Sequence, residues 1–382
     1  MKKALLAAAL MSAGVVAHAQ SSVTLYGRLD AGIEYMSGVP SGGGTGAATQ
    51  STNRWKAESG DWGTSLWGMK GVEDIGGGNK VLFQLEGSFN TMTGAGPGGG
   101  GLFNRWATVG LSNDAYGTFT MGRMLFISNG VWDFDPFGQS NWSSASLVRG
   151  RNWPQSSNNF AYQSPKIAGF DFYGQYALSN ATSWNGNGST AQGREAGAQI
   201  TYTNSLFQVR GLYDEIRNPA NGGLYGPQVG DINAANVGGG VFSASREYSA
   251  LVNVFLGQFK VQAAYQAVRS AGATGVLPGQ PTTLDHEWGG VTWQATPAAA
   301  LIAAVYHVNA NNGGGNATIY TVGGSYNLSK RTLLDIQVAT AQNSRNANFG
   351  LNANNPGTNA ATDNPLPGHA QTGVYAGIQH SF

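Results

Sequence analysis

The residue types that perform catalysis are present in this chain, but they are not spaced for it. After residue 20 the histidines are His286, His307, His369 and His380, and no two of them lie three or four residues apart, as a zinc pair on one helix requires. The chain has no Gly-x-Ser-x-Gly nucleophile elbow. Its glycine runs lack the following Lys-Ser/Thr of a phosphate-binding loop. We therefore expect no catalytic residue, metal or cofactor. A hydrolase with a Ser–His pair across neighbouring strands remains an alternative.

The charged residues lie on one face of segments that alternate with a period of two. In the segment 22–34, Leu25 and Leu29 share one face, whereas Arg28 and Asp30 share the other. The same alternation recurs in 169–178, 206–216, 245–256, 259–270 and 331–342. Such a pattern predicts strands that are apolar on one side and wet on the other.

The composition narrows the class of protein. Charged residues make up only 11% of the 382 residues, and 58 residues are glycine, whereas about 25% charged residues is usual. The formal net charge of +1 argues against nucleic acid as a partner, because nucleic acid binding needs a basic stripe. Cysteine is absent, so stability must come from hydrogen bonds and packing rather than from disulfides.

The start of the chain predicts export. Two lysines precede a largely apolar stretch over 4–17, and a small-x-small cleavage site ends at Ala19. We expect a signal peptide over 1–19 and an exported domain over 20–382.

The end of the chain predicts the membrane in which it resides. Val374, Ala376 and Ile378 alternate with polar residues, and the chain stops on the aromatic Phe382. An amphipathic strand closed by a terminal Phe resembles the last strand of a bacterial outer-membrane β-barrel. By this resemblance Phe382 is the assembly signal and the protein resides in the cell outer membrane.

Connections between the alternating segments are short and long in turn. The long ones are rich in Gly, Asn and Pro and cover 37–53, 93–101, 124–157, 179–193, 217–244, 271–283 and 343–370. Short turns on one side and long loops on the other are typical of transmembrane barrels. We count sixteen strands, roughly 22–34, 62–72, 80–91, 103–113, 117–123, 158–164, 169–178, 194–203, 206–216, 245–256, 259–270, 284–296, 300–309, 317–328, 331–342 and 371–382. The expected fold is all-β, a transmembrane antiparallel 16-stranded β-barrel; fourteen or eighteen strands are the alternatives.

Three blocks of sequence resemble Gram-negative general porins, most closely the trimeric porins of β-proteobacteria. They are Val23-Thr24-Leu25-Tyr26-Gly27-Arg28-Leu29-Asp30-Ala31-Gly32, Gly68-Met69-Lys70-Gly71-Val72-Glu73-Asp74, and Phe103 to Leu111 followed by Gly117 to Arg123. The resemblance implies a homotrimer embedded in outer-membrane lipid and lipopolysaccharide, through which ions and small hydrophilic solutes diffuse. It also implies that the loop at about 124–157 folds inward and constricts the pore.

The resemblance further implies a charge arrangement at that constriction, with loop carboxylates facing a row of arginines on the barrel wall. Asp133 and Asp135 are the candidate loop carboxylates. Arg105 and Arg28 are the wall candidates, with Lys70 nearby and Arg123 at the start of the loop. Opposed charges across a narrow aqueous gap bias which ions pass.

Each of these residues has a simpler interpretation. The wall cations could form salt bridges with Asp30 or Glu34 that only stabilise the lumen. Asp133 and Asp135 could cap the turn that begins before Pro136, because Asp is a common turn starter.

The chain also departs from the family pattern. Leu66 and Gln155 stand near positions where related porins often carry arginine, although Arg149 and Arg151 lie just upstream of Gln155. Trp132, Trp142 and Trp153 add bulk to the same loop. We therefore expect a narrower opening with a weaker anion preference than in related porins, which strong anion selectivity in a KCl gradient would contradict.

Two other functions fit parts of the pattern. A substrate-specific channel of the same fold could use the Trp, Asn and Ser residues of the loop to hold a sugar or an aromatic solute. A secreted β-rich adhesin would be soluble without detergent, and its apolar faces would pack against each other.

Overall fold

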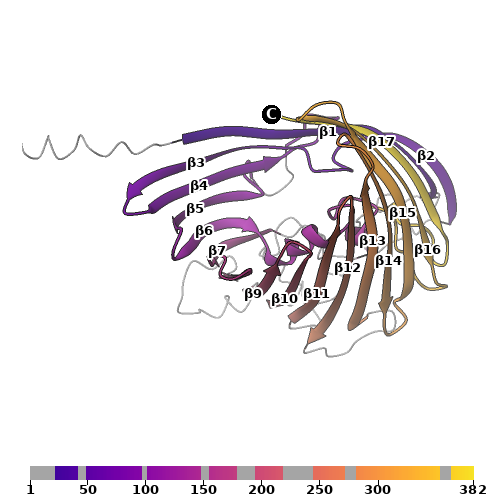
Figure 1. Ribbon diagram of the computed structural model, residues 1–382. Coiled ribbons are helices and arrows are strands. Elements are labelled where there is room, and N and C mark those ends of the chain that lie inside the picture. Colours follow the sequence, from indigo (N-terminus) through magenta and orange to yellow (C-terminus); the bar gives the residue numbers. More distant parts are fainter. Residues whose placement is uncertain are drawn as a thin grey trace, which may run out of the picture.

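The computed structural model shows one antiparallel sheet that curves round and closes on itself (Figure 1). The described residues are 22–41, 49–96, 101–147, 155–178, 194–217, 244–271, 281–352 and 363–382. The expected signal peptide over 1–19 lies outside them, as do Arg149, Arg151 and Trp153 of the long loop. No helix among the described residues is long and apolar enough to span a membrane.

Strands make up nearly all of the described structure. Their bounds are β1 (Ser22–Ser41), β2 (Gln50–Glu58), β3 (Leu66–Gly76), β4 (Asn79–Ser88), β5 (Trp106–Asn113), β6 (Gly117–Leu125), β7 (Gln155–Gln163), β8 (Phe170–Ala177), β9 (Arg194–Thr203), β10 (Phe207–Arg217), β11 (Ala244–Leu256), β12 (Phe259–Ala271), β13 (Thr283–Gln294), β14 (Ala299–Ala310), β15 (Gly315–Asn327), β16 (Thr332–Asn343) and β17 (Gln371–Ser381). Two short 3₁₀ helices, η1 (Ile127–Phe134) and η2 (Ser144–Ser146), lie between β6 and β7.

The pairing of β1 decides the strand count. The first part of β1, Ser22 to Arg28, pairs with β3, and its later part, from Gly32 to Ser41, pairs with β2. β2 and β3 therefore share one place in the barrel, so the seventeen described strands fill sixteen positions. On its other edge β1 pairs with β17, which closes the sheet. The expected 16-stranded antiparallel barrel is confirmed.

The first hairpin is longer than we expected. The segment 37–53 was expected to be a loop, but β1 continues to Ser41 and β2 begins at Gln50. Pro40 and the polar run over 50–53 conceal the hairpin, because they leave no apolar alternation to read. Beyond the register shift after Met36 the pairing has no apolar face, whereas before it the rings of Tyr35 and Trp55 lie together, 4.9 Å apart.

The chain between β2 and β3 also differs from the prediction. A strand was expected over 62–72, but β3 begins only at Leu66. The preceding residues 59–65 leave the wall, and Asp61 among them is buried. We call residues 59–65 the inward segment.

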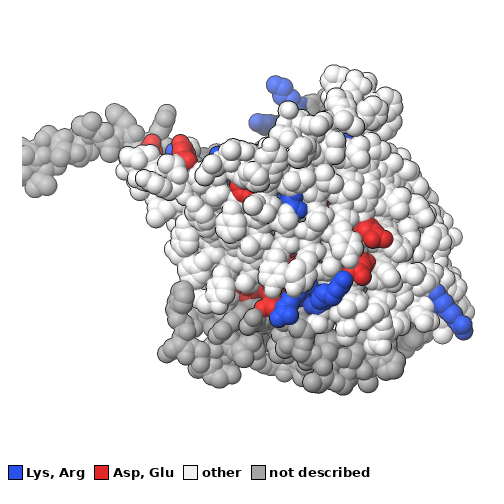
Figure 2. Space-filling view, turned by 60° about the horizontal axis from the view of Figure 1, so that its bottom comes forward, with Lys and Arg blue, Asp and Glu red and all other residues white. Residues whose placement is uncertain are grey.

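The two faces of the sheet are reversed relative to a soluble protein. In β1, Leu25 is 61% exposed and Ile33 is 60% exposed, whereas Asp30 and Glu34 are fully buried. The outer surface seen in Figure 2 is mostly free of charged side chains. A soluble sandwich would bury the apolar side chains, whereas a transmembrane barrel turns them toward lipid. The expected apolar packing of an adhesin is not found in the described residues.

The hydrophobic core lies inside the barrel, between the loop after β6 and the far wall. Phe134, Phe137 and Trp142 of this loop are buried against wall residues of β13 to β17. In Figure 1 this loop, with η1, lies within the curve of the sheet. Glycines of the wall make room for it, because a side chain at Gly290 would come within 2.6 Å of Pro136 and one at Gly373 within 2.8 Å of Trp142. The expected inward fold of this loop is confirmed.

The carboxy terminus completes the closure. The backbone N–H of Phe382 donates to the carbonyl oxygen of Gly27, and the N–H of Gly27 donates to the carbonyl oxygen of Phe382, each at 3.1 Å. A β-carbon at Gly27 would lie only 2.2 Å from the Phe382 ring, so this close approach needs glycine. A role of Phe382 as assembly signal remains a proposal.

Candidate pore constriction

The loop between β6 and β7, described over residues 126–147, is called the inward loop below. Three side chains of the wall hold it at one main-chain atom. The carbonyl oxygen of Asp133 accepts hydrogen bonds from Asn253 Nδ2 at 3.0 Å, Lys260 Nζ at 3.2 Å and Gln262 Nε2 at 3.1 Å. These donors come from β11 and β12. One residue further on, Trp288 Nε1 donates to the carbonyl oxygen of Phe134 at 3.0 Å. These four hydrogen bonds tie the backbone of the loop to the wall at two successive residues.

Asp135 fixes the loop through its side chain. Its carboxylate accepts from the backbone N–H groups of Phe137 at 2.8 Å and Ser144 at 3.1 Å, and from the hydroxyl of Tyr306 at 2.7 Å. Burial raises the pKa of the Asp135 carboxyl above its ordinary value. We expected the Asp135 carboxylate to face the pore. It does not, because its oxygens bind the loop turn and Tyr306 of the wall.

Asp133 keeps its carboxylate in water, but beside a cation of the wall. Its side chain is 63% exposed and lies 3.1 Å from Nη1 of Arg210 in β10. The same Nη1 donates to the carbonyl oxygen of Gly130 at 2.5 Å, and the guanidinium lies over the Phe134 ring at 4.9 Å from its centroid. Arg210 thus contacts the loop at three points and forms an ion pair with Asp133.

Arg105, the residue directly before β5, forms an ion pair with an acidic residue of β4. Its Nε donates to Glu86 Oε1 at 2.6 Å, and Tyr26 donates to the other oxygen, Oε2, at 2.9 Å. The simpler interpretation of the wall cations was a salt bridge with Asp30 or Glu34. For Arg105 the partner is instead Glu86. The ion pair fixes the guanidinium without using its Nη atoms.

Arg28 is oriented in a similar way from β1. Its Nε donates to the carbonyl oxygen of Thr64 in the inward segment at 2.9 Å. In the described part of the chain, neither Arg28 nor Arg105 makes a hydrogen bond through its Nη atoms. The Nη atoms of both are therefore left without a hydrogen bond in the described structure, although the Arg105 side chain is only 9% exposed.

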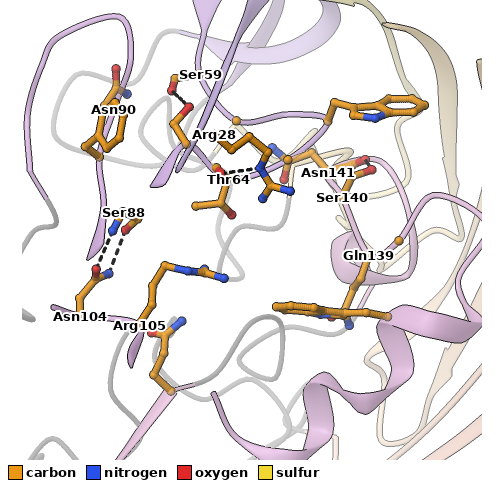
Figure 3. A pocket seen from close by; sticks show the side chains of 18 of the residues that line it. Arg28, Ser59, Thr64, Ser88, Asn90, Asn104, Arg105, Gln139, Ser140 and Asn141 are labelled. Carbon is orange, nitrogen blue, oxygen red and sulfur yellow. Dashed lines mark hydrogen bonds between the residues drawn. The ribbon is translucent and has the colours of Figure 1, made fainter. Parts of the chain in front are cut away.

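Arg28 and Arg105 line the same cavity, of about 530 Å³. In Figure 3 both side chains extend toward the loop that carries Gln139, Ser140 and Asn141. The described lining contains these two arginines and no carboxylate. The expected opposition of loop carboxylates to wall arginines is therefore not found around this cavity, since Asp133 turns to Arg210 and Asp135 to Tyr306.

The inward segment forms the other border of this cavity together with the loop. Asn141 Nδ2 donates to Asp61 Oδ1 at 2.6 Å, and the N–H of Asn141 donates to the carbonyl oxygen of Asp61 at 3.2 Å. Burial, followed by the nearby carboxylates of Glu34 and Glu58, raises the pKa of Asp61 well above its ordinary value. The inward segment and the loop thus meet through these two hydrogen bonds and through the ring contact of Trp62 with Phe137.

The other two predicted cations lie away from the cavity. Lys70 is exposed, sits opposite Thr24 in the sheet, and has its Nζ 5.3 Å from the centroid of the Tyr26 ring. Arg123 braces the loop base, with Nε donating to the carbonyl oxygen of Asn104 at 2.6 Å and Nη1 to Ser157 Oγ at 2.8 Å. Neither is among the residues that line the cavity.

The comparisons with known proteins agree with this geometry. A family model described as Gram-negative porin matches residues 4–348. The chain belongs to the Gram-negative porin family. It is 33% identical to an outer membrane porin protein of Bordetella pertussis over 58% of this chain and 61% of that protein, which is less than two thirds of its length. It is 29% identical to outer membrane porin protein 32 of Delftia acidovorans over 100% of both chains.

The solved structures show the same fold. An anion-selective porin from Comamonas acidovorans superposes with a TM-score of 0.75 at 22% identity, over 95% of this porin and 100% of that chain. A trimer form of the outer membrane protein OmpT of Vibrio cholerae gives a TM-score of 0.63 at 12% identity, over 95% and 99% of the chains. The family match and the outer membrane porins among its relatives, together with this fold, make the protein a β-barrel of the outer membrane.

Three residues at the constriction escaped the sequence analysis. Glu86, Arg210 and Tyr306 each bind a residue that we had singled out. Alternation alone could place Arg210 on the lumen face of its strand, beside Gln208. No sequence signal could show that the loop crosses to this strand, because the contact joins residues 77 positions apart. Of the two departures from the family pattern, Gln155 lines the cavity, whereas Leu66 is buried and sits opposite Arg28 in the sheet.

Proposed function

We propose that this porin forms a water-filled channel for the passive diffusion of small hydrophilic solutes and ions, with a moderate preference for anions. The observation that carries the proposal is the pair of arginines in a cavity whose described lining holds no carboxylate. Rows of one sign of charge in a narrow aqueous passage bias the ions that enter it. A solute that passes here meets the guanidinium groups of Arg28 and Arg105 and, among the described lining residues, no carboxylate.

The preference is expected to be moderate because carboxylates stand behind the arginines. Glu86 backs Arg105 directly, and Asp30 lies two residues from Arg28 on the same face of the strand. An anion 4 Å from a single unit charge gains about 1 kcal/mol in bulk water and about 4 kcal/mol at the effective dielectric of a protein surface. The buried carboxylates offset part of this gain, so we expect a severalfold preference, weaker than that of a passage lined by uncompensated arginines.

Planar-bilayer recordings of the purified porin in a KCl gradient test this function. We expect stepwise insertion of conducting units and a reversal potential of the sign that chloride selectivity gives. Folded protein without conductance would refute the channel, and a reversal potential of the cation-selective sign would refute the role of the arginines. A reversal potential near that of an ideal anion-selective pore would refute the offset by the buried carboxylates.

We also propose that the porin is a homotrimer, surrounded by outer-membrane lipid and lipopolysaccharide. The support is the likeness of its fold to that of a protein solved in a trimer form. The mass of the protein part of the detergent complex, measured by light scattering, should equal three chains. A mass of one chain under conditions that keep the barrel folded would contradict the proposal.

A further inference from the structure

The constriction cavity carries aromatic rings as well as arginines. Trp62 of the inward segment, Phe89 just after β4, and Trp132 of the inward loop all line it. The Trp62 ring is held edge-on against Phe137, with the ring centroids 6.1 Å apart and an interplanar angle of 85°. Rings from three separate parts of the chain therefore line the same cavity as the two arginines.

We propose that this cavity binds small aromatic carboxylates, single-ring acids of the benzoate type, as they pass through the channel. The inference rests on the proposed channel function, and it adds the class of solute that the constriction favours. It makes the porin selective among anions of similar size rather than only between anions and cations.

The two arginines suit the carboxylate end of such a solute. A guanidinium binds a carboxylate best through two parallel N–H donors, and both arginines keep their Nη atoms unused in the described structure. Each is already oriented through Nε, Arg28 by Thr64 and Arg105 by Glu86. A preorganised side chain loses less conformational freedom when the solute binds.

The indoles and Phe89 suit the ring of the solute. Aromatic rings attract one another in offset or edge-on arrangements beyond the area they bury, and an arginine can also lie over a ring face. The side chains of Gln139, Ser140 and Asn141 make the rest of this border polar, and those of Ser140 and Asn141 are already held by hydrogen bonds to neighbouring groups.

Other solutes would use only part of this lining. A phosphate or an aliphatic acid engages the arginines and leaves three aromatic side chains without a matching surface. A neutral sugar engages the rings and amides, but leaves two guanidinium groups without an anion. An aromatic carboxylate is the class that uses both.

The test is calorimetric titration of the detergent-purified porin with benzoate and, separately, with cyclohexanecarboxylate, which has the same charge and a similar size but no aromatic ring. We expect benzoate to bind more tightly. Trp132→Leu and Trp62→Leu should each weaken benzoate binding by roughly threefold to tenfold, the range for one lost aromatic contact, and leave cyclohexanecarboxylate nearly unchanged. Trp67→Leu is the matched control, because Trp67 does not line the cavity.

Equal affinities for the two acids would overturn the inference, and so would benzoate binding that both cavity variants leave unchanged. The comparison of the two acids on the unaltered porin needs no variant, so it decides the question even if a tryptophan variant fails to fold. Binding is measured without current, so it is independent of the channel proposal. Conductance with an anion-selective reversal potential but equal affinities would remove only the aromatic preference.

Discussion

The two sides of the constriction use the same residue types for different ends. On the side of β10 to β14, Arg210 and the Asp135 carboxylate hold the inward loop in place, and the exposed Asp133 carboxylate pairs with Arg210. On the side of β1 and β5, Arg28 and Arg105 are fixed only through Nε and extend into the cavity. A charged side chain inside the barrel can therefore act on passing solutes only if it still has hydrogen-bonding groups that the anchoring of the loop does not use.

The largest effect is expected from the anchoring side. Asp135→Ala removes the acceptor for two backbone N–H groups and the Tyr306 hydroxyl, all of them buried. Donors left without a partner cost about 1–3 kcal/mol each, so the turn around Asp135 should loosen, although the main-chain bonds at residues 133 and 134 remain. We expect larger and noisier single-channel currents, together with a lower midpoint of thermal unfolding in detergent.

The control for this variant is Asp114→Ala, since Asp114 is exposed at a short turn and pairs only with Lys80 in the described structure. Asp135→Ala currents as quiet as those of the unaltered porin would show that the loop does not depend on this carboxylate.

The next effect is expected from the cavity side. Arg105→Gln removes a guanidinium from the lining and leaves Glu86 without its ion pair. The ratio of chloride to potassium permeability should fall severalfold, because a cation is lost and a buried carboxylate is unmasked. Reversal potentials in a KCl gradient measure this ratio.

Lys70→Gln removes the same charge from the lumen face of β3, away from the cavity, and should change the ratio much less. Equal changes of the permeability ratio in Arg105→Gln and Lys70→Gln would show that the cavity position has no special role.

A smaller effect is expected from Asp133→Asn. The main-chain anchor at residue 133 does not involve the carboxylate, so the loop should stay in place. The lost charge leaves Arg210 partly uncompensated, which should raise the anion preference slightly. A fall in anion preference, or currents as noisy as those of Asp135→Ala, would show that the carboxylate holds the loop after all.

The smallest effect is the pH dependence of thermal stability that comes from Asp61, where the inward segment meets the inward loop. The pKa of Asp61 is raised well above 3.8 by burial, so the folded protein favours the protonated acid. The stability that this proton contributes is fully present below about pH 3.8 and is lost as the pH rises through the raised pKa. Thermal unfolding midpoints should therefore decrease over that rise.

Asp61→Asn mimics the protonated acid and can still accept the hydrogen bond from Asn141. It should remove this part of the pH dependence, and an unchanged slope would assign the dependence to other groups.

The sequence predicts the barrel, but it does not show which groups the charged side chains of the loop face. Period-two alternation identifies the wall because lipid on one side and water on the other impose it on every strand. It misses β2, whose residues Gln50 to Asn53 are polar throughout, since that hairpin is held by main-chain hydrogen bonds.

The resemblance to general porins also places the inward loop and points to both cavity arginines. It cannot tell whether Asp133 and Asp135 face the gap or the wall, because that depends on which strand the loop reaches. The partners of the two, Arg210 and Tyr306, lie 77 and 171 residues further along the chain.

The central claim is that Arg28 serves passing solutes while Arg210 serves the loop. Reversal potentials of Arg28→Gln and Arg210→Gln in the same KCl gradient test it most directly. The account predicts that Arg28→Gln moves the reversal potential markedly toward zero, whereas Arg210→Gln moves it much less and instead makes the current noisier. Equal shifts for the two variants, or a larger shift for Arg210→Gln, would contradict it.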